Sequence, residues 1–375
     1  MMTLLRAGLP ALLFFLMALL GCTTTTRQPD TEPINVAPSP LGIGPDDVTL
    51  VFAGDTNFIW GVEDLQRRRG MVYPLEDVMQ LLSSADLAGV NLETAVTRTG
   101  TPINEKNYIF NSSPLLAGVL ADVGVDVLML ANNHSMDMGS QGILDTIEFA
   151  RRRGMLTPGA GTNVHEAALP AIITVKGMTV AIFSANDIGP QTNFATGNAP
   201  GTASISVVQS NVRNWCGFID FCVVNLHWGM EYSPNPIAGQ RKTAEALIKA
   251  GADAIIGHHP HIPQGIEVID GKPVFYSVGN FLFGSVNFKQ THNLIVRLVL
   301  DKNTKQIKRS EVYVVDGVYR ENGHRIRILN GAEAMPVWEE IFVQSKALGT
   351  RSYLAFGEDL KSMVVFPKPI PAEQQ

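Results

Sequence analysis

Short apolar runs alternate with stretches of helical periodicity through most of the chain. The runs are rich in β-branched residues, which is typical of strands buried on both faces of a sheet. Strands that alternate with helices form a sheet covered by helices, so the pattern predicts an α/β fold. We expect strands over 48–54, 86–93, 125–132, 221–229, 252–261, 293–301 and 307–319, hairpins over 169–187 and 265–280, and helices over 73–85, 112–124, 139–154, 203–215, 236–251 and 337–349.

Polar clusters directly follow several of these expected strands. Because the carboxyl ends of strands in an α/β sheet meet at one crevice, we expect these side chains to converge. Carboxylates and imidazoles together suit Zn, Mn, Fe or Co better than Ca, and a carboxylate can bridge two ions about 4 Å apart. The sequence therefore predicts a metal site. The clusters are Gly54-Asp55, Asn91-Leu92-Glu93, Ala131-Asn132-Asn133-His134, His227-Trp228-Gly229 and Gly257-His258-His259-Pro260-His261.

Each cluster taken alone also has a plainer interpretation. Asp55 could belong to a turn or a helix cap, Glu93 could face solvent, and His227 could be a structural histidine. The His-x-His pattern at His259 and His261 is more informative, because alternate residues of an extended segment point the same way. Five of the eight histidines lie in the clusters, which favours the joint interpretation.

Six motifs run in order across residues 48–285 and are similar to those of a known family. They are Gly54-Asp55, Asn91-Leu92-Glu93-Thr94, Ala131-Asn132-Asn133-His134 with Asp137 and Gly139, His227-Trp228-Gly229-Met230-Glu231-Tyr232, Gly257-His258-His259-Pro260-His261 with Gln264, and Tyr276-Ser277-Val278-Gly279-Asn280-Phe281. The chain thus resembles the CapA family of capsule-synthesis proteins, also described as poly-γ-glutamate synthesis proteins. That family looks like a branch of the calcineurin-like metallophosphatase fold. The resemblance implies a metallophosphatase-like four-layer αββα sandwich with mixed sheets.

The resemblance also implies a role for each matching position. Asp55 would be the first metal carboxylate, and Glu93 lies where metallophosphatases place a bridging Asp. Asn133 would be an amide ligand, and His134 would be the proton donor, with Asp137 as its partner. The ion would be a divalent transition metal (Mn, Zn or Fe), in one or two copies. The remaining implied ligands are His227, His259 and His261.

Four other residues are candidates for binding substrate. Asn57 follows the first cluster, while Glu231 and Tyr232 could either orient substrate or support their loop. Asn280 could contact a ligand or simply form a turn. His258 is an extra histidine in its motif, and we expect it to point away from its neighbours.

Two positions depart from the metallophosphatase pattern. Metallophosphatases carry Asp-x-His at the first motif, whereas this chain has Asp55-Thr56-Asn57, so one imidazole ligand is replaced or lost. The Asp that follows Asn-His is here Ser135, which leaves Asp137 as the partner of His134. A single ion, or binding without a metal, is therefore an alternative to a two-metal site.

The amino-terminal residues predict a targeting segment rather than part of the fold. Residues 1–21 combine one charge, Arg6, with an apolar run, as a signal peptide does, and end in a motif that resembles a bacterial lipobox. We therefore expect lipidation of Cys22, with an ordinary signal peptide as the alternative. Residues 22–46 are rich in Thr and Pro and predict a semi-stiff tether. A metallophosphatase-like domain over 47–286 follows, and 287–375 would add strands that complete the sandwich, a helix and a tail.

Cysteine content and charge narrow the possibilities further. Cys216 and Cys222 could form a small disulfide, or Cys222 could be a free buried cysteine in its strand. The net charge of −6 makes a broad nucleic-acid surface unsuitable, so we expect no nucleic-acid partner. The basic runs 67–69 and 151–153 could hold an anionic polymer, although solvated helix ends are the default interpretation.

These observations lead to one expectation and two rivals. We expect a lipid-anchored protein of the cell envelope, facing the periplasm or the exterior. By resemblance, it would act in the synthesis, export or anchoring of an anionic surface polymer such as poly-γ-glutamate, with that polymer or its machinery as partner. Metal-dependent hydrolase or transferase chemistry would take place at the strand-end site. The rivals are a non-catalytic polymer-binding scaffold and an envelope phosphodiesterase unrelated to capsule.

Overall fold

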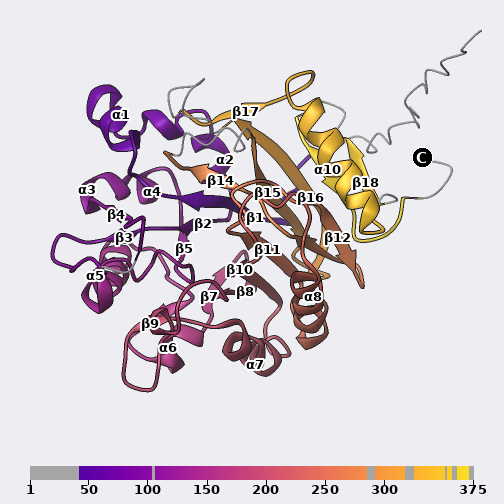
Figure 1. Ribbon diagram of the computed structural model, residues 1–375. Helices are drawn as coiled ribbons and strands as arrows, with labels where there is room; N and C mark the ends of the chain where they lie inside the picture. The colour runs from indigo at the N-terminus through magenta and orange to yellow at the C-terminus, as the bar shows by residue number, and fades with distance from the viewer. Residues whose placement is uncertain are drawn as a thin grey trace, which may run out of the picture. The chain divides into compact units, whose positions relative to one another are not determined.

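The computed structural model describes residues 42–103, 106–284, 292–316, 325–350, 353–356 and 361–370 (Figure 1). The expected signal peptide, Cys22 and the expected tether up to residue 41 lie outside the described residues. Within the described part of the chain, no helix has the length and apolar character needed to cross a membrane.

The larger sheet is built around β1 (Asp47–Thr56), the first expected strand. β1 pairs in parallel with β2 (Leu87–Leu92), which pairs in parallel with β5 (Val127–Met129). On its other side β1 pairs antiparallel with β15 (Asn293–Asp301). The sheet is therefore mixed. Its other strands are β14 (Asn280–Leu282), β16 (Gln306–Asp316), β17 (Arg327–Leu329), β18 (Leu354–Phe356) and β19 (Met363–Val365).

The second sheet is centred on β10 (Phe221–His227). β8 (Met178–Asn186) and β11 (Ala254–His258) flank β10 in parallel, so the carboxyl ends of the three strands lie at one edge. The expected hairpins are confirmed, because β7 pairs antiparallel with β8 and β12 with β13. The outer strands are β7 (Ala171–Val175), β12 (Ile266–Ile269) and β13 (Lys272–Phe275).

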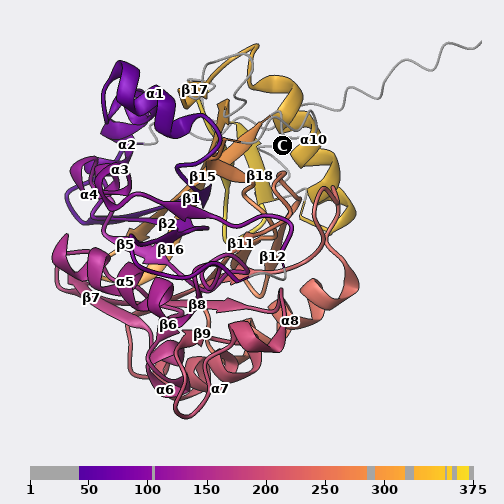
Figure 2. The ribbon, with the colours of Figure 1, turned by 60° about the vertical axis from the view of Figure 1, so that its left-hand side comes forward.

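The two sheets pack face to face and helices cover their outer faces (Figures 1 and 2). Along β1, Leu50 and Phe52 point into the core between the sheets, while Val51 and Ala53 point toward helices, as the period of two requires. This arrangement is the expected four-layer αββα sandwich. The helices over the larger sheet are α1 (Val62–Arg69), α2 (Met79–Ser83), α3 (Pro114–Ala117), α4 (Val119–Asp122) and α5 (Gly139–Arg152). Those over the second are α6 (Val164–Ala168), α7 (Ile205–Trp215) and α8 (Ala238–Ala250).

The carboxyl-terminal region contributes to the same core. In α10 (Met335–Ala347), Trp338 and Ile341 are buried in the cluster that lies between the sheets. The remaining short elements are β3 (Ala95–Val96), β4 (Asn111–Ser112), β6 (Ala160–Gly161), β9 (Gly201–Thr202) and the 3₁₀ turns η1 (Tyr73–Leu75) and η2 (Gln191–Asn193).

Two expected helices are broken in the structure. The stretch 73–85 forms η1 and then the short helix α2, with a turn at 76–78 between them. The stretch 112–124 is interrupted at Gly118 between α3 and α4.

The disulfide and the basic runs also have clear outcomes. Cys216 and Cys222 are joined in a disulfide, so the free-cysteine alternative is wrong. Both basic runs lie at helix ends, and each includes an arginine that pairs with a glutamate of its own helix, while Arg153 contacts Asp122 of α4. Arg67 contacts Glu63 at 2.6 Å, and Arg151 contacts Glu148 at 2.7 Å. The helix-end interpretation of these runs is confirmed.

Candidate metal centre

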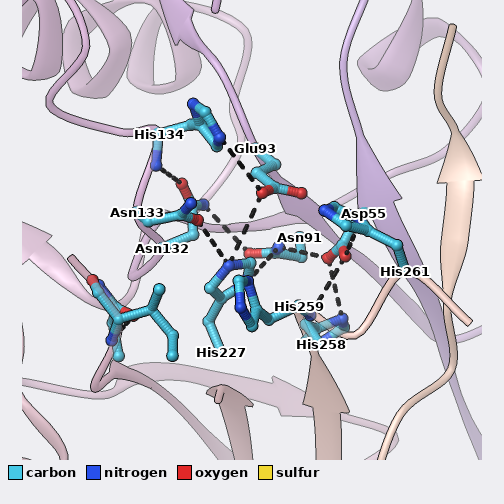
Figure 3. A network of polar contacts seen from close by, with 12 residues as sticks. Asp55, Asn91, Glu93, Asn132, Asn133, His134, His227, His258, His259 and His261 are labelled. Atoms are coloured by element: carbon cyan, nitrogen blue, oxygen red, sulfur yellow. Dashed lines mark hydrogen bonds and ion pairs between the residues drawn. The ribbon is translucent and has the colours of Figure 1, made fainter. Parts of the chain in front are cut away.

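The polar clusters meet where the carboxyl ends of strands from both sheets come together (Figure 3). Asp55 ends β1 and Glu93 follows β2, while His227 and His258 end β10 and β11. The backbones at Gly54 and Gly279 approach closely at this point. A Cβ at Gly54 would lie 2.0 Å from the carbonyl oxygen of Gly279. Glycine at that position therefore lets β1 lie against the segment that carries Asn280.

Glu93 is the most unusual residue of the cluster. Its side chain is fully buried, and neither carboxylate oxygen has a hydrogen-bond partner among the described residues. His259 is likewise buried, and its Nδ1 has no hydrogen-bond partner in the part of the chain that the structure describes. Ligand atoms of Glu93, His259 and His261 all lie within 4.8 Å of one another. A buried carboxylate without partners is costly, and a cation between these atoms would satisfy it, so the donor set fits a divalent transition metal.

Asp55 is held by contacts from three directions. Its Oδ1 accepts a 2.7 Å hydrogen bond from Asn91 Nδ2, and its Oδ2 accepts one of 3.2 Å from the backbone N–H of His259. Nδ1 of His261 lies 3.3 Å from Oδ2, and Nδ1 of His258 lies 3.7 Å from Oδ1. We expected His258 to point away from its neighbours, but it faces the Asp55 carboxylate.

Both ring nitrogens of His227 contact side-chain amides. Nε2 lies 2.7 Å from Oδ1 of Asn133, and Nδ1 lies 3.2 Å from Nδ2 of Asn91. The Nε2 atom is also 3.7 Å from Glu93 Oε1. Thus Asn133 and His227 stand beside the Glu93, His259 and His261 group, hydrogen-bonded to each other.

His134 and Asp137 form a pair at the edge of the cluster. Nδ1 of His134 lies 2.6 Å from Oδ2 of Asp137, and its Nε2 lies 3.9 Å from Glu93 Oε1. Asp137 also accepts hydrogen bonds from Lys106 Nζ at 2.5 Å and from the backbone N–H of Phe110 at 2.7 Å. The ring of Phe110 stacks on the imidazole of His134, with the centroids 3.7 Å apart.

The His-x-His pair converges for a different reason from the one expected. β11 ends at His258, and His259 and His261 have positive φ values of 95° and 59°. The segment is therefore a turn rather than an extended strand, and the left-handed backbone positions place both rings at the site. His261 Nδ1 lies 2.9 Å from Oδ1 of Asn280, so Asn280 contacts a candidate ligand side chain.

The other expected substrate-binding residues lie farther from these contacts. Asn57 is buried, its Oδ1 accepts a 3.4 Å hydrogen bond from Ile59 N–H, and its Nδ2 has no partner among the described residues. Tyr232 lies with its ring centroid 6.1 Å from that of His261, and its N–H donates to the carbonyl of Pro260. Glu231 is exposed to solvent.

Burial and neighbouring charges separate the pKa values of the cluster. Burial and the charge of Asp55 raise the pKa of Glu93 well above its usual range. Burial lowers the pKa of His259 to about 3 and that of His258 to about 4. Burial opposes protonation of His261 as well, yet Glu93 and Asp55 raise its pKa to about 10. Burial also raises the pKa of Asp55, but the hydrogen bond from His261 and the surrounding histidines outweigh it and lower that pKa.

Several contacting residues had no assigned role in the sequence. Asn132 Nδ2 donates to Asn91 Oδ1 at 3.2 Å, so two amides from different strand ends form a chain that leads to Asp55. Because Asn91 and Asn132 both lie in the six motifs, the sequence did give a signal for these two residues. Lys106 and Phe110 come from a loop without regular structure, where no periodicity pointed to them.

Comparisons with known proteins agree with the motifs. A family model described as bacterial capsule synthesis protein PGA_cap matches residues 49–285. The chain is 32% identical over 263 residues to the PGA biosynthesis protein CapA of Bacillus subtilis, covering 69% of this chain and 69% of that protein. It is 31% identical over 247 residues to the capsule biosynthesis protein CapA of Bacillus anthracis, covering 64% of this chain and 60% of that protein. Among solved structures, a 5'-nucleotidase precursor from Thermus thermophilus aligns at 13% identity and a TM-score of 0.43, covering 82% of this chain and 60% of that chain.

Proposed function

Because this chain belongs to the bacterial capsule synthesis protein PGA_cap family, we propose that it carries out metal-dependent chemistry on an anionic surface polymer of the poly-γ-glutamate type. The reaction would be hydrolysis of a link in that polymer, or transfer of its end to another acceptor. The names of the two Bacillus relatives support the process, and the geometry of the cluster supports the chemistry.

One observation carries the chemical part of the proposal. Within the described ranges, the Glu93 carboxylate is buried without a hydrogen-bond partner, close to a buried His259 nitrogen that also has none and to His261. Such an arrangement is costly unless a cation occupies it. Glu93, His259 and His261 would hold the ion, with Asp55 beside them. When bound, the ion would supply Lewis-acid polarisation of the scissile group and acidify water at the site.

The residues around the ion site have separate tasks. Asp137 accepts from His134 and fixes its tautomer, so that Nε2 is the atom that gives or takes a proton. Hydrolysis of an amide link breaks its C–N bond, adds the oxygen of water to the carbonyl carbon, and requires a proton on the leaving nitrogen. His134 Nε2 faces the site and is placed to accept a proton from the attacking water and pass it to that nitrogen. Burial lowers the pKa of His134, while Asp137 opposes that effect.

We also propose that the protein is anchored to a membrane of the cell envelope through a lipidated Cys22. The support is the sequence Leu19-Leu20-Gly21-Cys22 after an apolar run, together with the Thr- and Pro-rich stretch that follows. Several acyl chains on one cysteine bury enough methylene groups to hold a protein stably at a bilayer. The fold would then face the periplasm or the exterior, beside the machinery that makes or exports the polymer.

The function is tested with purified poly-γ-glutamate and the full chain in detergent, supplied with Mn, Zn or Fe. We expect shortened or transferred chains with wild type, and at least a hundredfold loss with Glu93→Gln. Glu148→Gln, which changes an exposed carboxylate on α5, is the matched control and should keep the activity. Binding of polymer without any change in its length would support a scaffold instead. Turnover of phosphoesters alone would support an envelope phosphodiesterase.

A further inference from the structure

A group of aromatic side chains runs from the candidate metal centre to the surface. It consists of Trp60, Tyr108, Phe110 and Phe283. The Trp60 ring makes edge-on contacts with all three others, at centroid distances of 5.7 Å to Tyr108, 4.8 Å to Phe110 and 6.0 Å to Phe283. These residues come from the loop after β1, the loop before β4 and the segment after β14.

The inner members of the group touch two histidines of the cluster. Phe110 stacks on His134 at 3.7 Å, with the ring planes 7° apart. Phe283 lies 5.0 Å from the ring of His261. Any ligand lying on the outer members would therefore be one aromatic ring away from the candidate proton donor and from a candidate ligand of the ion.

The outer members are exposed while the inner ones are buried. Trp60 is 43% exposed and Tyr108 is 64% exposed, against 3% for Phe110 and 4% for Phe283. Leaving large aromatic faces in water forgoes the free energy of burying them, and exposed Trp and Tyr side chains are the usual anchors of binding surfaces. Their continuity with the polar cluster indicates that their ligand also reaches that cluster.

We propose that Trp60 and Tyr108 form a binding subsite for the backbone of a γ-linked glutamate chain, next to the link that enters the metal centre. This proposal rests on the proposed function, because it takes its polymer from there. Each unit of such a chain has a planar amide and two methylenes, which lie well against an aromatic face. The carboxylates of the units would stay in water.

The charges at the site favour backbone contact over recognition of the carboxylates. The Lys106 ammonium, two residues before Tyr108 in the chain, already contacts Asp137 and is not free to pair with a carboxylate of the polymer. The carboxylates of the polymer therefore gain little from this lysine.

The test measures binding of a γ-linked glutamate hexamer to the full chain in detergent, by calorimetry and by tryptophan fluorescence. We expect Trp60→Ala and Tyr108→Ala each to weaken binding about tenfold or more, and Trp60→Phe to bind nearly as wild type does. Phe218→Ala removes an aromatic residue that is 89% exposed elsewhere, in the disulfide loop, and should bind unchanged. Tyr108 is the more exposed of the pair, so its variant keeps the test valid if Trp60→Ala does not fold.

The subsite and the proposed function can fail separately. His259→Ala should abolish turnover but keep binding of the hexamer, because it leaves both outer aromatic residues in place. If the alanine variants of Trp60 and Tyr108 bind the hexamer as tightly as wild type, the subsite is refuted whether or not the protein is an enzyme. Absence of any hexamer binding by wild type, or preference for a neutral pyranose oligosaccharide, would also overturn it.

Discussion

The side-chain amide of Asn91 donates a 2.7 Å hydrogen bond to Oδ1 of Asp55. The two residues are neighbours across the parallel pair β1 and β2, so the register of the sheet fixes their contact. The same amide nitrogen lies 3.2 Å from Nδ1 of His227, which comes from the other sheet. Asn91 thus connects the two halves of the candidate centre without itself offering a carboxylate or an imidazole.

Replacing Asn91 tests whether this connection matters. Asn91→Ala frees the Asp55 carboxylate and one nitrogen of His227, so we expect metal affinity to fall roughly 10- to 100-fold, as is usual when a residue that orients ligands is removed. Titration calorimetry with Mn or Zn measures the change. Asn211→Ala removes an amide of α7 that donates to the carbonyl of Ala168 in α6. This control variant should bind metal as wild type does. Equal affinity in both variants would show that Asn91 has no part in the site.

Metal binding should release protons. Glu93 and Asp55 outweigh burial and raise the pKa of His261 to about 10, so this group holds a proton near neutral pH. Burial and the charge of Asp55 also raise the pKa of Glu93. A ligand must lose its proton before it binds the ion, so affinity should rise with pH, by up to about tenfold per pH unit for each proton displaced. His259, whose pKa is lowered to about 3, adds no proton at neutral pH.

Proton release is measured by calorimetry at pH 7 in two buffers with different enthalpies of ionisation. We expect the apparent binding enthalpy to differ between the buffers, and to differ less in Glu93→Gln. The same enthalpy in both buffers would mean that neither Glu93 nor His261 loses a proton when the ion binds.

The metal-free protein should lose stability in acid through His258. Burial lowers its pKa from 6.5 to about 4, so between these values the unfolded chain binds a proton that the folded chain does not. Stability from this residue is therefore complete above pH 6.5 and falls as the pH drops. At pH 4.5 the loss should be about 2 kcal/mol.

Unfolding by urea at pH 7 and pH 4.5, with a chelator present, measures that loss. His258→Gln should lose less stability over this range than wild type. His165→Gln, which changes an exposed histidine of α6, should lose as much as wild type. If His258→Gln and wild type respond identically to acid, the buried imidazole does not carry the effect.

Lipidation of Cys22 is tested in cells that express the chain with a clickable fatty acid. We expect label on wild type and on Cys216→Ser, and none on Cys22→Ser, because only Cys22 follows the apolar run. The unlabelled variant should leave the membrane fraction. Label that persists in Cys22→Ser would contradict the proposed anchor.

Much of the fold followed from the sequence because strand signals are local. The apolar runs at β1, β8 and β10 each contain several β-branched residues, and burial on both faces explains their apolar character. By contrast, β14 is three residues long and shows no periodicity by itself. Its pairing with β1 depends on the approach of Gly279 to Gly54, which is a tertiary contact.

The candidate centre was predictable in its members more than in its contacts. Asp55 and Glu93 come together at neighbouring strand ends of the larger sheet, and His227 reaches them from a strand end of the second sheet. The facing of His258 toward Asp55 was not predictable, because the backbone leaves the strand at His259 with a positive φ. Likewise, Phe110 reaches His134 from a loop, and no residue spacing in the sequence encodes that stacking.

The central claim is that Glu93, His259 and His261 hold a transition-metal ion. The direct test is the metal content of the full chain after dialysis, by elemental mass spectrometry, in wild type, His259→Ala and the exposed control His165→Ala. The account predicts about one to two ions per chain in wild type and in the control, and loss of metal in His259→Ala. No metal in wild type, even after addition of Mn or Zn, would contradict it.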